Sequence, residues 1–286
     1  MSVRSAIRTF VDNELPQLAR NWRKARDWWI WSHSKLNTTK LGFVYYGDPL
    51  LFESRMSSGE IALVDMLLSA NSIFCDVGAN VGVFTLYARS RGHHVVAIEP
   101  EARNFALLCR NLSINGFTDV ELFHTALGDE HGLISLYGSG EGASLLQGWG
   151  GIQSTYSSLV PVTTMDRLLS HYDLDIPMVI KVDVEGSEYK VLLGAKRTLR
   201  RLHVVWIVEN GLTRNFQGIN PHFRDVFEIF WSQGYLGYSP GLRRFIGITD
   251  IERWVEQGTT NCSEVNYVFV RPGSRAAFML QGTQSL

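Results

Sequence analysis

The sequence has few cysteines, no long apolar run and almost no net charge. Its three cysteines are scattered along 286 residues, and no two of them have the short spacing of a metal site. Such cysteine usage is typical of a reducing compartment, and residues 1–10 lack the apolar core of a signal peptide, so we expect a cytoplasmic protein. No apolar run reaches the roughly 18 residues that a membrane-spanning helix needs.

The charges are balanced, with 27 Lys and Arg against 28 Asp and Glu. A net charge of -1 gives no chain-wide positive field to attract nucleic acid, so we expect no nucleic-acid partner. Hydrophobic residues make up 45% of the chain and charged residues 19%, which is ordinary for a globular protein. The length suits one large domain, with or without an extension.

The rest of the chain is organised around residues 73–100. Residues 73–75 are an apolar run typical of a buried parallel strand, 76–82 form a glycine-spaced turn, 83–91 can be a helix, and 95–98 a second buried strand. This is a β-α-β unit, whose crossover in a parallel sheet is right-handed. It places the turn and the end of the second strand at the sheet edge where open α/β folds bind ligands.

The turn differs from that of a dinucleotide-binding fold. Asn80 stands where that pattern needs a glycine, and Asp76 would repel a diphosphate but suit a ligand ammonium. Glu99, just past the second strand, can accept both hydroxyls of a ribose. A ligand with a ribose, an adenine, an amino-acid end and no phosphate fits, so we predict that the cofactor is S-adenosylmethionine. A glycine turn alone would be weak support, because many strand–helix turns contain glycine.

The predicted cofactor site draws on several elements. Thr125 and Ala126 follow a third strand over 120–123, where adenine would lie. Glu60 is placed near the methionine end of the cofactor, and a capping role at the helix over 61–68 fits it equally well. The predicted cofactor-binding residues are Glu60, Asp76, Gly78, Ala79, Asn80, Gly82, Thr85, Glu99, Pro100, Thr125, Ala126 and Asp183.

Acidic residues follow four of the predicted strands: Asp76, Glu99, Asp183 and Glu209. Burial of a carboxylate is unfavourable unless a ligand or a partner is present. Chance placement of turn residues explains one or two such positions, but not four. We therefore expect this edge of the sheet to be the active site.

Several blocks of the sequence resemble the FkbM family of S-adenosylmethionine-dependent methyltransferases. The matching blocks are 76–85, 97–100, Asn111 with Asn115, 126–129, 163–166, 181–188, Gly194 with Ala195, and the acidic end of 205–209. The likeness covers roughly residues 60–209, and the block over 181–188 is its most specific part. The resemblance implies an α/β class I methyltransferase fold, Rossmann-like, with a mostly parallel sheet and helices on both faces. It also implies O-methylation in natural-product or glycan biosynthesis.

Transfer of a methyl group to a hydroxyl requires removal of the hydroxyl proton, so a general base or a metal is needed. Asp183 is the first candidate for a catalytic base because it ends the strand beside the cofactor strand, and Glu185 and Glu209 follow. The alternative for Asp183 and Glu185 is a role at the start of the next helix. Lys181 can pair with one of these carboxylates. No metal site is predicted, because no ligand spacing indicates one.

Residues 1–40 differ from the remainder because they are basic and carry four tryptophans. We predict a helical extension that packs on the core or on a second copy of the chain, with contact to a membrane surface as the alternative. The catalytic domain is predicted over 41–272, with an antiparallel last strand over 265–270, and 273–286 as a frayed tail. A helix is expected over 187–202.

A Gly- and Ser-rich segment over 138–158 carries Trp149 and is too polar to be core. We expect it to fold over the site and to help select the acceptor. The acceptor itself, a small molecule or glycan, cannot be identified from the sequence. Two other functions stay open: a nucleic-acid methyltransferase, and a non-catalytic S-adenosylmethionine-binding protein.

Overall fold

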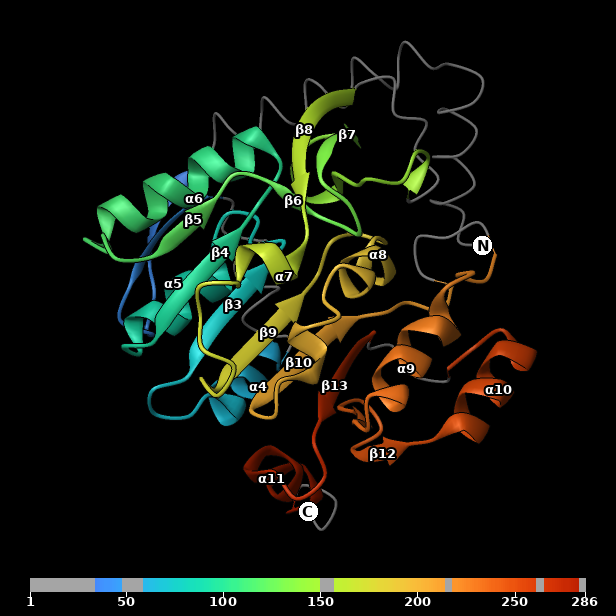
Figure 1. Cartoon of the computed structure of the whole chain (residues 1–286). Helices are drawn as coiled ribbons and strands as arrows, with labels where there is room; N and C mark the ends of the chain where they lie inside the picture. Colours follow the sequence, from blue (N-terminus) through green and yellow to red (C-terminus); the bar gives the residue numbers. More distant parts are fainter. Residues whose placement is uncertain (1–33, 48–58, 150–156, 214–217, 261–264, 283–286) are drawn as a thin grey trace.

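The computed structural model describes residues 34–47, 59–149, 157–213, 218–260 and 265–282 (Figure 1). Most of the predicted extension over 1–40 lies outside these ranges. Within them, no helix combines the length and the apolar character that crossing a bilayer requires.

Within the described residues, a central sheet of eight strands organises the molecule. Its order is β12 (Arg244–Ile246), β11 (Leu236–Ser239), β13 (Asn266–Val270), β10 (Val204–Glu209), β9 (Met178–Val182), β3 (Ile73–Val77), β4 (His94–Ile98) and β5 (Glu121–Phe123). The five strands from β10 to β5 are parallel, whereas β13 runs antiparallel to both β10 and β11. This confirms the predicted α/β methyltransferase fold and its antiparallel last strand.

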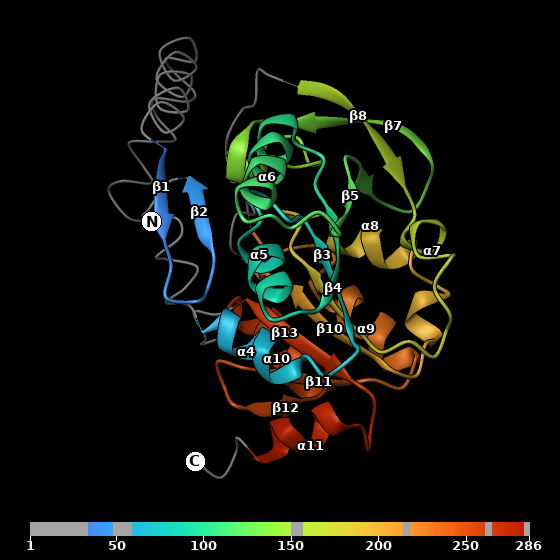
Figure 2. The same cartoon turned by 90° about the vertical axis from the view of Figure 1, so that its left-hand side faces the viewer.

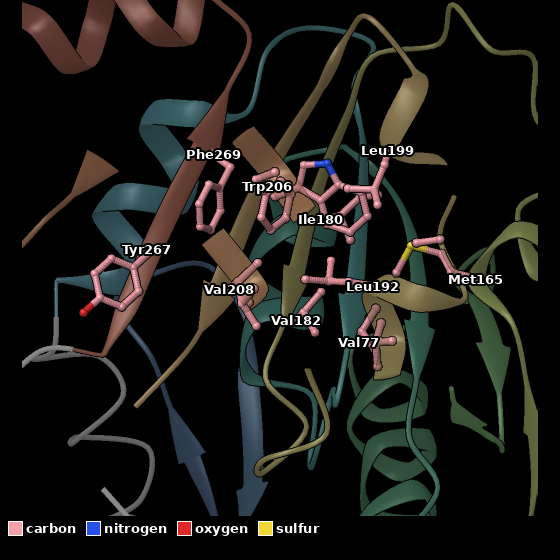
Figure 3. Packing of buried hydrophobic residues seen from close by; sticks show 14 of the residues in the cluster. Val77, Met165, Ile180, Val182, Leu192, Leu199, Trp206, Val208, Tyr267 and Phe269 are labelled. Atoms are coloured by element: carbon pink, nitrogen blue, oxygen red, sulfur yellow. The ribbon is translucent and has the colours of Figure 1, made fainter. Parts of the chain in front are cut away.

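Helices cover both faces of the sheet, and each face has its own buried core. On one face lie α4 (Glu60–Leu67), α5 (Val83–Ser90), α6 (Ala102–Ile114) and α11 (Arg275–Gly282). On the other lie α7 (Met165–Leu168), α8 (Glu188–Leu193), α9 (Phe223–Ser232) and α10 (Ile248–Gln257). Figure 3 shows the second core, where the sheet side chains Val77, Val182 and Trp206 meet Leu192 of α8. Strands buried on both faces explain the continuous apolar runs of the sequence.

A smaller sheet lies above one end of the central sheet in both views (Figures 1 and 2). It has the order β6 (Ala126–Leu127), β8 (Ser157–Thr163), β7 (Gly132–Tyr137). The described part of the segment between β7 and β8 includes a short 3-10 helix, η1 (Gly140–Gly142). This arrangement carries residues 138–149 over the carboxyl ends of the main strands.

The end of the predicted extension is a strand rather than a helix. Strand β1 (Lys35–Thr38) pairs antiparallel with β2 (Val44–Gly47), and Figure 2 shows this hairpin beside α5 and α6. Two asparagines hold it: Asn111 of α6 bonds both backbone groups of Tyr46, and Asn115, which caps the end of α6, bonds both backbone groups of Val44. The asparagines thus replace a neighbouring strand, which a helical interpretation of this segment could not anticipate.

Two other predictions are corrected. The helix expected over 187–202 ends at Leu193 and resumes only as a 3-10 turn, η3 (Thr198–Arg200), because Gly194 packs against the backbone of Gly128. Within the tail expected over 273–286, residues 275–282 form helix α11, which buries Ala276, Ala277 and Leu280 against the core, and residues 283–286 lie outside the described ranges. These three small or apolar side chains lie on one helical face and fix the segment.

Candidate active site

A cavity of about 580 Å³, including its mouth open to solvent, lies at the carboxyl ends of β3, β4 and β9. Seven of the predicted cofactor residues line it: Gly78, Asn80, Glu99, Pro100, Thr125, Ala126 and Asp183. Glu185, a predicted catalytic residue, lines it as well. The cavity therefore joins the predicted cofactor residues to the predicted catalytic ones.

Glu99 is fixed as an acceptor of hydrogen bonds in this cavity. Its Oε2 accepts from the backbone N–H of Asn80 at 2.7 Å, and its Oε1 accepts from the N–H of Glu101 at 2.8 Å. Burial raises the pKa of Glu99 to about 7, while these hydrogen bonds oppose the shift. A carboxylate has about four acceptor positions, and Asn104 Nδ2 donates to Oε1 at 3.5 Å as a third partner, so capacity is left for a ribose hydroxyl.

The turn after β3 approaches the end of β9 closely. A Cβ at Gly78 would lie 1.9 Å from the backbone oxygen of Asp183, and the φ of Gly78 is +83°, so only glycine fits. Asn80 has φ 53°, and its Oδ1 accepts from the N–H of Val81. Asparagine tolerates this left-handed conformation, which accounts for its presence where a dinucleotide fold would have glycine.

Five predicted cofactor residues do not line the cavity. Asp76 is buried beneath the turn and accepts a hydrogen bond from Thr85 Oγ1 at 2.7 Å. Gly82 begins α5 and packs against Leu108, and Ala79 is buried in the core. Glu60 begins α4 and accepts from Asn266 Nδ2 at 2.6 Å, a contact between α4 and β13. These residues support the turn or neighbouring elements and do not line the cavity.

The three predicted catalytic carboxyl groups meet at the end of β9 and β10. Oxygens of Asp183, Glu185 and Glu209 lie within 4.8 Å of one another, a spacing at which they could hold a metal ion. Lys181, 2% exposed, donates to Asp183 Oδ2 at 2.7 Å, and its Nζ lies 4.6 Å from the centre of the Phe84 ring. The predicted pairing of Lys181 with a carboxylate is therefore confirmed.

The carboxyl groups of Glu209 and Asp183 interact directly. Burial raises the pKa of Glu209 well above the ordinary value, and the neighbouring charge of Asp183 and a hydrogen bond to it add to the shift. Two carboxyl groups this close favour sharing a proton, with one neutral and the other charged. The arrangement can accept or release a proton beside the cavity.

Glu188, in the first turn of α8, holds the turn that precedes this helix. Its Oε1 accepts from the N–H groups of Val184 and Gly186, at 3.2 and 3.0 Å. Burial raises the pKa of Glu188 to about 7. Sequence reasoning matched Glu188 to the family pattern but gave it no role. The signal available was its position, five residues after Asp183 at the end of β9.

The segment over 138–149 closes the cavity from above. Gly140, Ala143, Ser144 and Leu145 line it, as expected of a loop that folds over the site. Asn104 Nδ2 donates to the backbone oxygen of Gly140 at 3.1 Å, which ties the loop to the helix beside Glu99. The remainder of the predicted loop, 150–156, lies outside the described residues.

Comparison with known proteins identifies the family. The model of the methyltransferase FkbM domain matches residues 76–236, more than half of the chain. The chain belongs to the FkbM methyltransferase family. The matched region contains Asp183, Glu185 and Glu209 as well as every predicted cofactor residue except Glu60.

Three similar proteins each share part of the chain. It is 28% identical over 145 residues to Methyltransferase 1 of Beauveria bassiana, covering 43% of this chain and 58% of that protein. It is 29% identical over 154 residues to the hexuronic acid methyltransferase AglP of Haloferax volcanii, covering 53% and 62%. The crystal structure of a methyltransferase FkbM from Methylobacillus flagellatus is 18% identical, with a TM-score of 0.44 over 71% of this chain and 44% of that one. The chain thus spans about three-fifths of the length of the two curated relatives.

Proposed function

We propose that the chain is an S-adenosylmethionine-dependent methyltransferase that methylates a hydroxyl on a sugar, a glycan, or a lipid-linked or polyketide-type small molecule. Membership of the FkbM family supports methyl transfer, and the relative from Haloferax volcanii, which is named a hexuronic acid methyltransferase, supports a sugar acceptor. The observation that carries O-methylation is the group of carboxyls around Asp183, which offers a proton acceptor at the cavity.

The cavity fits the cofactor by the chemistry of its residues. Glu99 would accept the ribose hydroxyls, the bare backbone of Gly78 would let the ligand approach, and Thr125 and Ala126 would border the adenine. When bound, S-adenosylmethionine supplies a methyl group already activated on a sulfonium. The protein's residues therefore have to orient the acceptor and remove its proton.

Asp183 is the proposed acceptor of the hydroxyl proton. The Lys181 ammonium stabilises negative charge on Asp183, and the hydrogen bond with Glu209 orients its carboxylate. Glu185, at the same edge of the sheet, can accept a hydrogen bond from a hydroxyl of the molecule that is methylated. No metal is part of the proposal, because Lys181 and the proton shared with Glu209 already compensate the negative charge. The methylation rate is therefore expected to be insensitive to EDTA, and loss of activity that Mg²⁺ restores would contradict this.

The test is the Asp183→Asn variant. Loss of a general base predicts a fall in turnover of about 100-fold or more, with the affinity for S-adenosylhomocysteine kept. Transfer of a labelled methyl group to a panel of sugars, lipids and phenols would measure turnover. Because the neutral amide of this variant would weaken the ion pair of buried Lys181, the double variant Lys181→Met with Asp183→Asn controls for lost stability. An unchanged rate in a folded Asp183→Asn protein would remove Asp183 from the mechanism.

A further inference from the structure

Trp149 is hydrogen-bonded to Glu185, a residue of the cavity lining, while Trp149 itself lies outside that lining. Its Nε1–H donates to Glu185 Oε2 at 2.8 Å, and Ser144 of the same loop donates from Oγ to the backbone oxygen of Glu185 at 2.7 Å. The indole is partly exposed. The loop thus joins a large aromatic side chain to a carboxylate that lines the cavity.

The backbone beneath Trp149 is shaped to receive it. A Cβ at Gly186 would lie 2.3 Å from Trp149 Cζ3, and the φ of Gly186 is +100°. Glu185 also has a left-handed φ of 53°, which is uncommon for a residue other than glycine and is found at functional sites. The indole therefore rests on the backbone of Gly186, is hydrogen-bonded to the carboxylate of Glu185, and has part of its surface in solvent.

We propose that Trp149 determines acceptor specificity and that the acceptor is an uncharged sugar ring. This inference rests on the proposed function. Sugars combine apolar C–H faces, which pack on an aromatic ring, with hydroxyl groups, which donate to carboxylates. Trp149 would take the ring face, while Glu185 and Asp183 would accept from its hydroxyls.

The charges around the cavity favour a neutral ring over an acidic one. Among the described residues that line the cavity, none is Lys, Arg or His. Lys181, at the end of the same strand, is engaged by Asp183. A uronic acid would bring its carboxylate close to those of Asp183 and Glu185 in a partly buried site, where like charges repel strongly. We therefore expect a hexuronide to bind at least about tenfold more weakly than the matching hexoside.

The experiment measures binding as well as turnover. Saturation-transfer NMR on the enzyme saturated with S-adenosylhomocysteine would compare methyl glucoside, galactoside and mannoside with methyl glucuronide and galacturonide. The expected result is saturable binding of at least one neutral glycoside and weaker binding of its uronide.

Variants at Trp149 test whether the glycoside affinity depends on its aromatic ring. Trp149→Phe keeps an aromatic ring and is expected to keep most of the glycoside affinity, whereas Trp149→Leu should lower it about tenfold. Affinity for S-adenosylhomocysteine should not change. Phe278→Leu is the matched control, since Phe278 is an exposed aromatic on α11 outside the cavity lining, and it should change neither affinity.

Four results would overturn the inference. The first three are uronides that bind as well as neutral glycosides, an unchanged glycoside affinity in Trp149→Leu, and the absence of saturable binding by every neutral glycoside. The fourth is a parallel loss of glycoside and S-adenosylhomocysteine affinity in Trp149→Leu, which would show that Trp149 only supports the fold. Failure of the wild-type protein to bind S-adenosylhomocysteine would instead contradict the proposed function.

Discussion

Replacement of Gly78 by Ala tests how the cofactor turn and the catalytic strand are joined. The added Cβ would lie 1.9 Å from the backbone oxygen of Asp183, whereas real Cβ contacts stay above 3.0 Å, so one segment must move by about 1 Å. The carbonyl cannot simply retreat, because the N–H of Asp183 donates to the oxygen of Val77 at 3.0 Å. The substitution therefore displaces the proposed base as well as the turn.

The loss of stability expected in Gly78→Ala has two causes. A left-handed alanine costs about 1–2 kcal/mol, and the overlap costs about 1–3 kcal/mol by analogy with overpacked cores. Together they predict a loss of roughly 2–5 kcal/mol in the free energy of unfolding. Because a displacement of about 1 Å can lower catalysis about 100-fold, turnover should fall more than stability alone explains.

Variants at two other glycines measure the conformational cost and the overlap cost separately. Gly92 has φ +88° and open space around it, so Gly92→Ala measures the conformational cost alone. Gly194 has a right-handed φ of -85° and the same 1.9 Å approach to a backbone oxygen, so Gly194→Ala measures the overlap alone. Urea denaturation of the three variants provides the comparison. If Gly78→Ala were no more destabilising than Gly92→Ala, the close approach of the turn to β9 would be refuted.

Two further predictions concern stability. Burial raises the pKa values of Glu99 and Glu188 to about 7, above the ordinary 4.5, so the folded state holds protons that the unfolded state releases. Their contribution to the free energy of unfolding is full below about pH 4.5 and is lost as the pH rises through 7, by up to about 3 kcal/mol for each group. Urea denaturation should therefore show lower stability at pH 8 than at pH 5. A stability that stays flat or rises over this range would contradict the prediction. Replacement of buried Asn111 by Ala removes its bonds to Tyr46 and Val81 and should cost about 2–4 kcal/mol, with faster amide exchange of Tyr46, whereas unchanged exchange would show that β2 is held by other contacts.

Local patterns predicted the central part of the fold. The apolar runs before Asp76, Glu99 and Asp183 are strands because they are buried on both faces, and their carboxyl ends meet because the strands are parallel. This placed Glu99 and Asp183 in one cavity without knowledge of any distance. The proximity of Glu209 follows from the same rule, since β10 lies beside β9.

The parts of the fold and of the site that the sequence did not predict depend on contacts between segments far apart in the chain. Trp149 reaches Glu185 across 36 positions, and Asn111 holds Tyr46 across 65, and no local periodicity encodes such pairs. Residues Asp76 and Thr85 belong to the matched motif but lie beneath the cavity. A sequence motif contains residues that support the turn as well as residues that contact the ligand. Similarly, Gly194 ends α8 through its approach to Gly128, which only the fold reveals.

Calorimetric titration with S-adenosylhomocysteine tests the central claim most directly. The account predicts saturable binding of one ligand per chain, weakened at least about tenfold by Glu99→Ala because the ribose hydroxyls lose their acceptor. The control Glu130→Ala, an exposed carboxylate outside the cavity lining, should bind as the wild type does. No binding by the wild-type protein, or equal binding by Glu99→Ala, would contradict the assignment of this cavity to the cofactor.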